Sequence, residues 1–217
     1  SDPHWGNVKL LVAAYADESQ VGRTVTTTGA SSGDPLVAEG IASTLLDAND
    51  GVAVTDAADL AVGSGDLTVE LWFAADGAGP GVNIERVFAI KGGGDQKEWA
   101  VNYYNGGFNI FASSDGSSWE HAVALSLAEV DRPVFFNGAT RHLALAKSGS
   151  AWSLYINGER MLGTIFVGQV YNGSGDLSIA LAGVAPSGRV DDFRVTMGVA
   201  RYTDGMENLA ARKFPRY

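Results

Sequence analysis

The sequence predicts an all-β fold, an antiparallel β-sandwich with little helix. Three observations support this: about a dozen short alternating runs separated by turn signals roughly every 8 to 12 residues, 28 glycines in 217 residues, and a single segment, 206–213, with moderate helix propensity. No Pro- or Ser-rich linker divides the chain, so we expect one sandwich domain over residues 1–217. Within it we expect residues 1–7 as an extended lead-in and residues 204–217 as a C-terminal extension.

The first expected strand spans residues 8–15. Alternate side chains of a strand lie on the same face, so Val8, Leu10, Val12 and Ala14 should face one side together. A polar stretch rich in Gly, Ser and Thr follows this strand and predicts long loops.

Three shorter features precede the clearest strand. Residues 23–28 are rich in Thr and Val and predict a weak edge strand. Residues 43–46 and 52–55 flank a turn signal and predict a β-hairpin. A short helical turn is expected at 59–62.

Residues 66–74, DLTVELWFA, form the clearest strand, because Leu67, Val69, Leu71 and Phe73 occupy alternate positions and should share the core face. The strands expected after it cover residues 86–90, 99–103, 108–112, 119–125, 140–147, 152–156, 160–165, 177–182 and the closing stretch 189–202.

One hairpin has the strongest local signal in the chain. Asn157 and Gly158 stand between the alternating runs 152–156 and 160–165. Both residue types tolerate the positive φ of a type I′ turn, so this pair predicts a two-residue hairpin loop.

The composition excludes several classes of protein. The chain has 15 basic and 25 acidic residues, and a net charge of −10 opposes non-specific contact with nucleic acid or with an anionic membrane. No apolar run reaches the roughly 18 residues needed to span a bilayer, and no basic segment followed by an apolar core predicts a signal peptide. The absence of cysteine excludes disulfide frameworks and thiolate metal sites. Because the chain begins at Ser1 without methionine, we expect a trimmed fragment.

The closing stretch 189–202, RVDDFRVTMGVARY, contains an unusual carboxylate. In strict alternation Asp191 shares the apolar face with Phe193, Val195 and Met197. A carboxylate on a buried face needs hydrogen-bond donors or a cation. Asp191 is therefore the first residue to consider for a structural ion.

Three motifs carry a family likeness: DLTVELWF at 66–73, RHLALAKSGSAWSLYINGERM at 141–161 and RVDDFRVTMGVARY at 189–202. In order and spacing they resemble the concanavalin A-like, laminin-G-like jelly-roll domains. The opening DPHWGNVKLLV at 2–12 is similar to the version found in bacteriophage structural proteins of tail or capsid. The resemblance implies a jelly-roll sandwich and a virion or extracellular location.

The chain departs from that family pattern in two places. The turn after the first strand contains Asp17 and Glu18, where the phage versions have an Asp-Ser-Ser-Gly-like turn. This weakens the case for an ion site built on the turn. Of the tryptophan–histidine pair that usually precedes the Asn-Gly hairpin, only His142 is present.

The sequence does not predict an enzyme. Glycoside hydrolysis needs two carboxylates that face each other across a cleft, and the acid after Glu70 is Asp76, beyond the end of the strand. Asp191 and Asp192 are adjacent and point to opposite faces of a strand unless a bulge intervenes. The three histidines are scattered, and none of the common hydrolase or phosphate-loop motifs occurs.

Residues 113–119, SSDGSSW, are similar to the sialidase Asp-box but lack one residue between Asp115 and Gly116. The segment instead predicts an Asp-Gly turn between two strands. Trp119 should then cover the resulting hairpin.

No cofactor is required by these motifs, and a structural Ca²⁺ is the metal hypothesis. Calcium binds several carboxylate and carbonyl oxygens, and Asp191, with Asp17 and Glu18, would supply them. In the alternative, Asp191 accepts hydrogen bonds from loop amides or pairs with an arginine such as Arg201.

Sugar binding needs aromatic rings beside amide or carboxylate groups, and Tyr103, Tyr104, Asn105 and Trp119 are the densest such combination. The alternative places Tyr103 in the core and Tyr104 outside, with Asn105 opening a turn.

Together these observations predict a non-catalytic recognition module of a phage virion or another extracellular assembly, which binds a surface glycan or a protein partner. The first alternative is a purely structural capsid or tail decoration module in contact with other virion proteins. A carbohydrate-active enzyme is the second alternative. A homo-oligomer is compatible with the first two.

Overall fold

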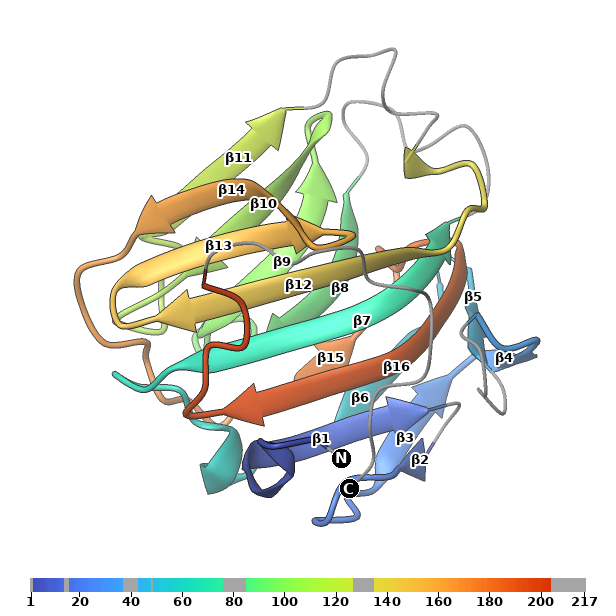
Figure 1. Cartoon of the computed structure of the whole chain (residues 1–217), viewed down its shortest axis with the longest axis horizontal. Helices are drawn as coiled ribbons and strands as arrows, with labels where there is room; N and C mark the ends of the chain where they lie inside the picture. Colours follow the sequence, from blue (N-terminus) through green and yellow to red (C-terminus); the bar gives the residue numbers. More distant parts are fainter. Residues whose placement is uncertain are drawn as a thin grey trace.

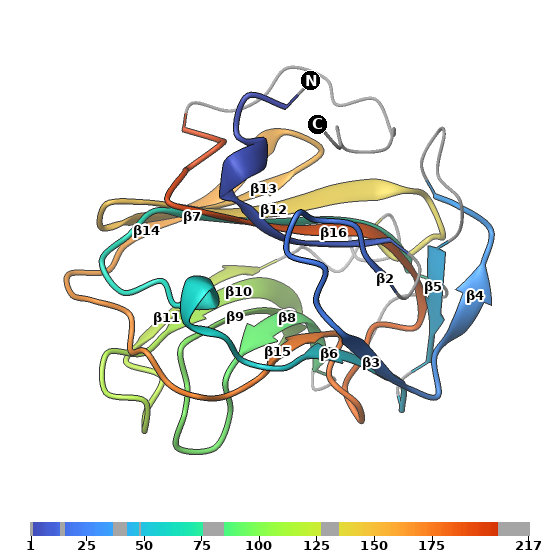
Figure 2. The same cartoon turned by 90° about the horizontal axis from the view of Figure 1, so that it is seen from below.

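The computed structural model describes residues 2–13, 16–36, 43–47, 49–75, 85–126 and 135–203. In these ranges the chain forms two antiparallel β-sheets and two short 3-10 helices, η1 (Trp5–Asn7) and η2 (Ala58–Leu60). The two sheets lie face to face as the layers of a sandwich (Figure 2). The predicted all-β sandwich with little helix is therefore confirmed. No helix in the described ranges is long and apolar enough to cross a membrane.

The larger sheet has nine strands among the described residues and faces the viewer in Figure 1. Its main order is β14 (Glu159–Ile165), β13 (Ala151–Ile156), β12 (Arg141–Ser148), β7 (Leu67–Ala75), β16 (Gly188–Met197), β1 (Val8–Ala13) and β2 (Ala16–Asp17). β5 (Ser43–Leu46) also pairs with β16, and β4 (Ser31–Gly33) pairs with β5.

The smaller sheet has seven strands in the described ranges. Their order is β11 (His121–Ser126), β10 (Gly107–Ala112), β9 (Trp99–Tyr104), β8 (Arg86–Lys91), β15 (Leu177–Ile179), β6 (Gly51–Val54) and β3 (Val25–Thr28). The last of these is the weak edge strand expected at 23–28.

The core lies between the sheets, and β7 shows how alternation builds it. Leu67, Val69, Leu71 and Phe73 belong to the main hydrophobic cluster, as predicted. All nine residues of β7 are nevertheless buried, including Glu70 on the outer face. Something must therefore cover the outer face of this strand.

The covering comes from two segments at opposite ends of the chain. The N-terminal segment, where we expected an extended lead-in, contains η1 and a buried Asp2. The segment after β16 turns back over β7 and β12 (Figure 1) and buries Tyr202. The C-terminal extension and the helix-prone 206–213 lie outside the described residues.

A β-bulge interrupts β16. Asp191 pairs with Trp72 of β7 and Arg194 with Glu70, so β16 has one more residue than β7 in this interval. Asp192 has a positive φ of 47°, and such a bulge reverses the alternation on either side of it. The expectation that Asp191 lies on the apolar face was wrong, because its register partner Trp72 belongs to the cluster on the outer face.

Two other expectations were wrong because strand pairing and register differ from what the local pattern predicts. β5 and β6 do not form a hairpin: β5 pairs with β4 and β16, whereas β6 pairs with β3 and β15 in the other sheet. In β1 a register shift after Val8 places this residue in the outer cluster with Leu11, away from Leu10.

The Asn-Gly hairpin is confirmed. β13 pairs with β14, and Asn157 and Gly158 have φ values of 51° and 84°, as a type I′ turn requires. The β9–β10 connection is built in the same way, with Asn105 at 55° and Gly106 at 83°.

Candidate functional site

A hollow of about 300 Å³ lies on the outer face of the seven-stranded sheet. Its lining includes three aromatic side chains, Tyr104, Phe111 and Trp119, and two polar ones, Glu85 and Asn102. The lining residues come from β8, β9 and β10 and from the segments that precede β8 and β11. Sugar-binding sites combine aromatic faces with a few polar groups in this way.

The alternation of β9 determines which side chains reach this hollow. Val101 and Tyr103 are core residues, whereas Asn102 and Tyr104 line the hollow on the opposite face. In the neighbouring strand Phe111 pairs with Ala100 and also faces outward. Two strands with period-two alternation thus place one amide and two aromatic rings on the same outer face, and Asn102 lies between the positions of the two rings in the register.

A chain of amide hydrogen bonds holds the polar side of the hollow. Asn109 Nδ2 donates to Asn102 Oδ1 at 3.1 Å, and Asn102 Nδ2 donates to a carboxylate oxygen of Glu85. Asn109 Nδ2 also donates to the carbonyl oxygens of Gly107, at 3.0 Å, and Tyr104, at 3.3 Å. Because the amide orientations are set by these bonds, Glu85 is held in place beside the aromatic rings.

The aromatic side is held by the turn at 113–119. The Asp115 carboxylate accepts hydrogen bonds from Ser117 N at 2.8 Å and Ser118 N at 3.0 Å, and these bonds, that from Ser118 foremost, hold the pKa of Asp115 below its usual range. Trp119 follows this turn and packs against Phe111 with ring centroids 5.7 Å apart. The predicted Asp-Gly turn, with Trp119 covering the hairpin, is confirmed.

The structure separates the four residues predicted for sugar binding. Tyr104 and Trp119 line the hollow together. Tyr103 is fully buried in the core, and Asn105 occupies the turn beyond the end of β9, outside the lining of the hollow. Tyr103 and Asn105 thus occupy the positions given by the alternative interpretation.

Sequence reasoning missed six of the eight lining residues, and three of these six, Glu85, Asn102 and Phe111, supply polar or aromatic groups. Alternation could have found Asn102, which shares a face with Tyr104 two positions away. The pairing of Phe111 with Ala100 could have been derived from the two-residue turn between β9 and β10. Glu85 precedes β8 and had no local signal.

The carboxylates considered for calcium bind backbone amides. Asp17 accepts hydrogen bonds from the backbone N–H groups of Leu11, Ser19 and Arg23, at 3.0, 2.8 and 2.7 Å. Glu18 follows Asp17, and its own N–H donates to the carbonyl oxygen of Leu11. The Asp17 carboxylate therefore closes its own turn.

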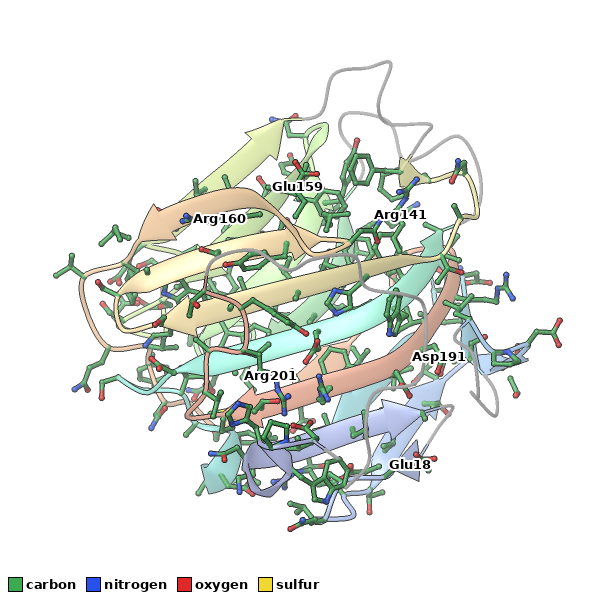
Figure 3. All side chains as sticks on the ribbon, in the orientation of Figure 1. Glu18, Arg141, Glu159, Arg160, Asp191 and Arg201 are labelled. Carbon is green, nitrogen blue, oxygen red and sulfur yellow. The ribbon has the colours of Figure 1, made fainter. Side chains whose placement is uncertain are left out.

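Asp191 is also satisfied by amides. Its carboxylate accepts from Leu36 N at 3.0 Å and from Asp192 N at 2.8 Å. Within the described ranges no three His, Cys, Asp or Glu side chains gather to hold a metal, so Asp17, Glu18 and Asp191 are not brought together as one site. Figure 3 shows Asp191 on β16 and Glu18 apart from it, next to the end of β2. These contacts favour the amide-acceptor alternative for Asp191.

A buried ionic cluster lies on the outer face of the nine-stranded sheet. Arg194 Nη2 is 2.6 Å from Glu70 Oε1, and Arg194 Nη1 is 3.0 Å from Asp2 Oδ2. Arg201 Nη2 contacts the same Asp2 oxygen at 2.8 Å. Arg194 is buried, and so is Asp192 two residues before it.

Glu70 is the centre of this cluster. Its Oε2 accepts a hydrogen bond from the phenol of Tyr202, and His142 Nε2 lies 3.1 Å from the same oxygen. Burial raises the pKa of Glu70, but the charge of Arg194 and the contacts with His142 and Tyr202 outweigh it and lower the pKa to about 2. These groups contact one another, so the cluster stabilises the fold and joins the segments that contain Asp2 and Tyr202 to the sheet.

Several solved structures are similar to this fold. The binding domain of Paraclostridial Mosquitocidal Protein 1 aligns with a TM-score of 0.72 at 14% identity, over 98% of this chain and 50% of that one. The receptor binding domain of botulinum neurotoxin C/D mosaic serotype aligns with a TM-score of 0.70 at 11% identity, over 98% and 49%. A botulinum neurotoxin type C structure aligns with a TM-score of 0.68 at 10% identity, over 98% and 50%. The chain thus spans about half of each of these proteins.

The structural relatives reported above are toxin binding domains rather than phage proteins, and at these identities they bear on the fold alone. No curated protein sequence matches the chain. Residues 46–199, which include most strands of both sheets, match the family model described as the concanavalin A-like lectin/glucanases superfamily. The chain is therefore a member of the concanavalin A-like lectin/glucanase superfamily.

Proposed function

We propose that this chain is a non-catalytic carbohydrate-binding module that binds sugar in the hollow on the outer face of the seven-stranded sheet. The observation that carries the proposal is the convergence of Tyr104, Phe111 and Trp119 with a carboxylate that is held by an amide chain. The apolar face of a sugar ring can pack on the aromatic rings. Its hydroxyl groups can donate to Glu85.

The volume of the hollow limits the size of the ligand and the affinity of a single site. About 300 Å³ lies at the lower end of the roughly 300 to 1,000 Å³ of ordinary ligand pockets, so the site accommodates a short glycan segment. A site of this size binds weakly by itself, and tight attachment requires several copies acting together. A multivalent assembly of this module is therefore part of the proposal.

The polar groups of the hollow favour binding over hydrolysis. Most glycoside hydrolases need two carboxylates on either side of the scissile bond, and Glu85 is the one carboxylate in the described lining. Glu70 and Asp191, two acids within the family motifs, are buried in other contacts on the other sheet.

The structural relatives support a glycan as the partner class. The uptake of botulinum neurotoxin type C into cells depends on interaction with two ganglioside molecules, and the binding domain of botulinum neurotoxin DC has been solved in complex with SialylT. Since this chain covers half of those proteins, the glycan partner of this chain is a proposal to be tested directly.

The setting of the module, a phage virion or another extracellular assembly, rests on the sequence resemblance. The alternative is a capsid or tail decoration module whose partners are other virion proteins. Trimers that attach to empty particles and ignore cells and glycans would favour this alternative over the glycan-binding proposal.

The test is a glycan array probed with a multimeric form of the chain and with Trp119→Ala. We expect binding to a subset of glycans, and removal of the ring should weaken each site by roughly three- to tenfold, which avidity amplifies. Trp119→Phe should retain part of the affinity, and Val167→Ala, at an 88% exposed position elsewhere, should retain all of it. No binding by the multimer, or full binding by Trp119→Ala, would reject the proposed site.

A further inference from the structure

A second hollow, of about 230 Å³, lies on the outer face of the nine-stranded sheet, on the opposite side of the sandwich from the aromatic hollow. Small side chains of β12 and β13, among them Ala146 and Ser153, form its floor. Its walls include the larger side chains of Tyr155, Tyr202 and Arg160. The described lining contains no carboxylate.

The hollow exists because small residues meet across three strands. Ala146 of β12 pairs with Ser153 of β13, and Ser153 pairs with Gly163 of β14. Side chains that are directly opposite lie on the same face, so this row leaves a depression in the sheet surface.

The segment after β16 supplies one wall. Tyr155 Oη donates a hydrogen bond to the Tyr202 carbonyl at 3.0 Å, and the two rings lie 5.7 Å apart. Tyr202 is in turn held by its phenol, which donates to the buried Glu70. The wall is therefore fixed by the ionic cluster beneath it.

Arg160 supplies a positive charge at the second hollow. It pairs with Tyr155 across the β13–β14 hairpin and belongs to the edge strand β14 (Figure 3). Its guanidinium lies over Gly163, so closely that a Cβ on Gly163 would collide with it. Arg160 is exposed, and no ion pair or side-chain hydrogen bond joins it to another described residue. No side-chain hydrogen bond joins the hydroxyls of Ser148 and Ser153, which also line the hollow, to another described residue.

A guanidinium and two hydroxyls without partners among the described residues, in a described lining without carboxylates, suit a ligand with both a negative charge and hydroxyl groups. A guanidinium binds a carboxylate through two parallel hydrogen bonds, and serine hydroxyls can both donate to and accept from sugar hydroxyls. The volume lies below the usual range for larger ligands, so a single sugar unit is the appropriate size.

We propose that this second hollow binds the carboxylate of an acidic monosaccharide, with Arg160 as the anion-binding residue and Ser148 and Ser153 as partners of the sugar hydroxyls. The site is independent of the aromatic hollow, and either one can exist without the other. If both bind, the module contacts an acidic glycan from two faces.

The test is an NMR titration of the full chain with galacturonate, galactose and inorganic sulfate, followed at the Arg160 Nε–Hε signal and the amides of Ser153 and Gly163. Galacturonate should bind at least about tenfold more tightly than galactose, as expected for one charge-assisted contact. It should also bind more tightly than sulfate, because sulfate lacks the ring hydroxyls. If galactose binds as tightly as galacturonate, the carboxylate does not contribute and Arg160 is not the anion-binding residue. If sulfate binds as tightly as galacturonate, the site binds any anion and the sugar hydroxyls do not contribute.

Four variants test whether Arg160 binds the carboxylate. Arg160→Ala should reduce galacturonate affinity to that of galactose, and Gly163→Ala should weaken it several-fold by displacing the guanidinium while the net charge stays the same. Arg189→Ala removes the same charge from a distant part of β16 and should change nothing, and Trp119→Ala should leave this titration unchanged. Unaltered affinity in Arg160→Ala, with a well-dispersed spectrum that shows the fold intact, would reject the site.

Discussion

Glu70 of β7 and Arg194 of β16 face each other on adjacent strands and form a fully buried ion pair at 2.6 Å. The pair is shared: Arg194 also binds Asp2 near the N-terminus, and Glu70 also binds Tyr202 beyond β16. A single contact between two strands therefore fixes the segments that cover the outer face of the sheet.

Removal of one partner from this pair should be costly. Glu70→Ala leaves the Arg194 guanidinium buried without its main acceptor, and we expect a loss of about 3 to 5 kcal/mol in the free energy of unfolding. Urea denaturation followed by tryptophan fluorescence measures this loss. Glu159→Ala, at an exposed position, should change stability by less than about 0.5 kcal/mol. A loss below about 1 kcal/mol for Glu70→Ala would show that the cluster does not stabilise the fold.

The same carboxylate should make stability depend on pH. The folded state lowers the pKa of Glu70 from 4.5 to about 2, so its contribution is complete above about pH 5 and disappears as the pH falls towards 2. This loss is on the order of 3 kcal/mol. Unfolding free energies measured between pH 6 and pH 2 should fall more steeply for the native chain than for Glu70→Gln. Parallel curves would contradict the assignment.

Asp191 should act as an acceptor of backbone amides rather than as a calcium ligand. Asp191→Ala leaves two buried N–H groups, those of Leu36 and Asp192, without their acceptor, and we expect a loss of about 2 to 4 kcal/mol. EDTA should leave the melting temperature of the native chain unchanged. A melting temperature that falls with EDTA and recovers with added Ca²⁺ would restore the calcium hypothesis.

Asn105 should matter for the turn and not for sugar binding. Its φ of 55° is tolerated by Asn and Gly but strained for Ala, so Asn105→Ala should cost about 1 kcal/mol, whereas Asn105→Gly should be nearly neutral. Thermal unfolding measures both variants. On the glycan array both should bind like the native chain, and weaker binding by Asn105→Gly would return Asn105 to the list of ligand contacts.

Much of the fold could be predicted because strand alternation and turn chemistry are local. The core face of β7, the Asn157-Gly158 hairpin and the Asp-Gly turn before Trp119 each depend on a few consecutive residues. The same local rule located Tyr104 and Trp119, which line the aromatic hollow.

The errors arose where the register depends on a distant partner. The bulge at Asp192 appears only when β16 is paired with β7, and it reverses the face of Asp191. Likewise, nothing within 43–55 shows that β5 and β6 belong to different sheets.

By itself, the sequence determined the fold class, the turns and the inward face of most strands, because these follow from the two-residue period and from backbone preferences at Asn and Gly. Tertiary structure alone decided which polar groups are buried together and which remain open to a ligand. Glu70 meets Asp2 and Tyr202 through strand pairing and chain crossing, and Glu85 joins the aromatic rings in the same way. Such contacts depend on the pairing register of strands that are far apart in the sequence, for which a single sequence carries no local signal.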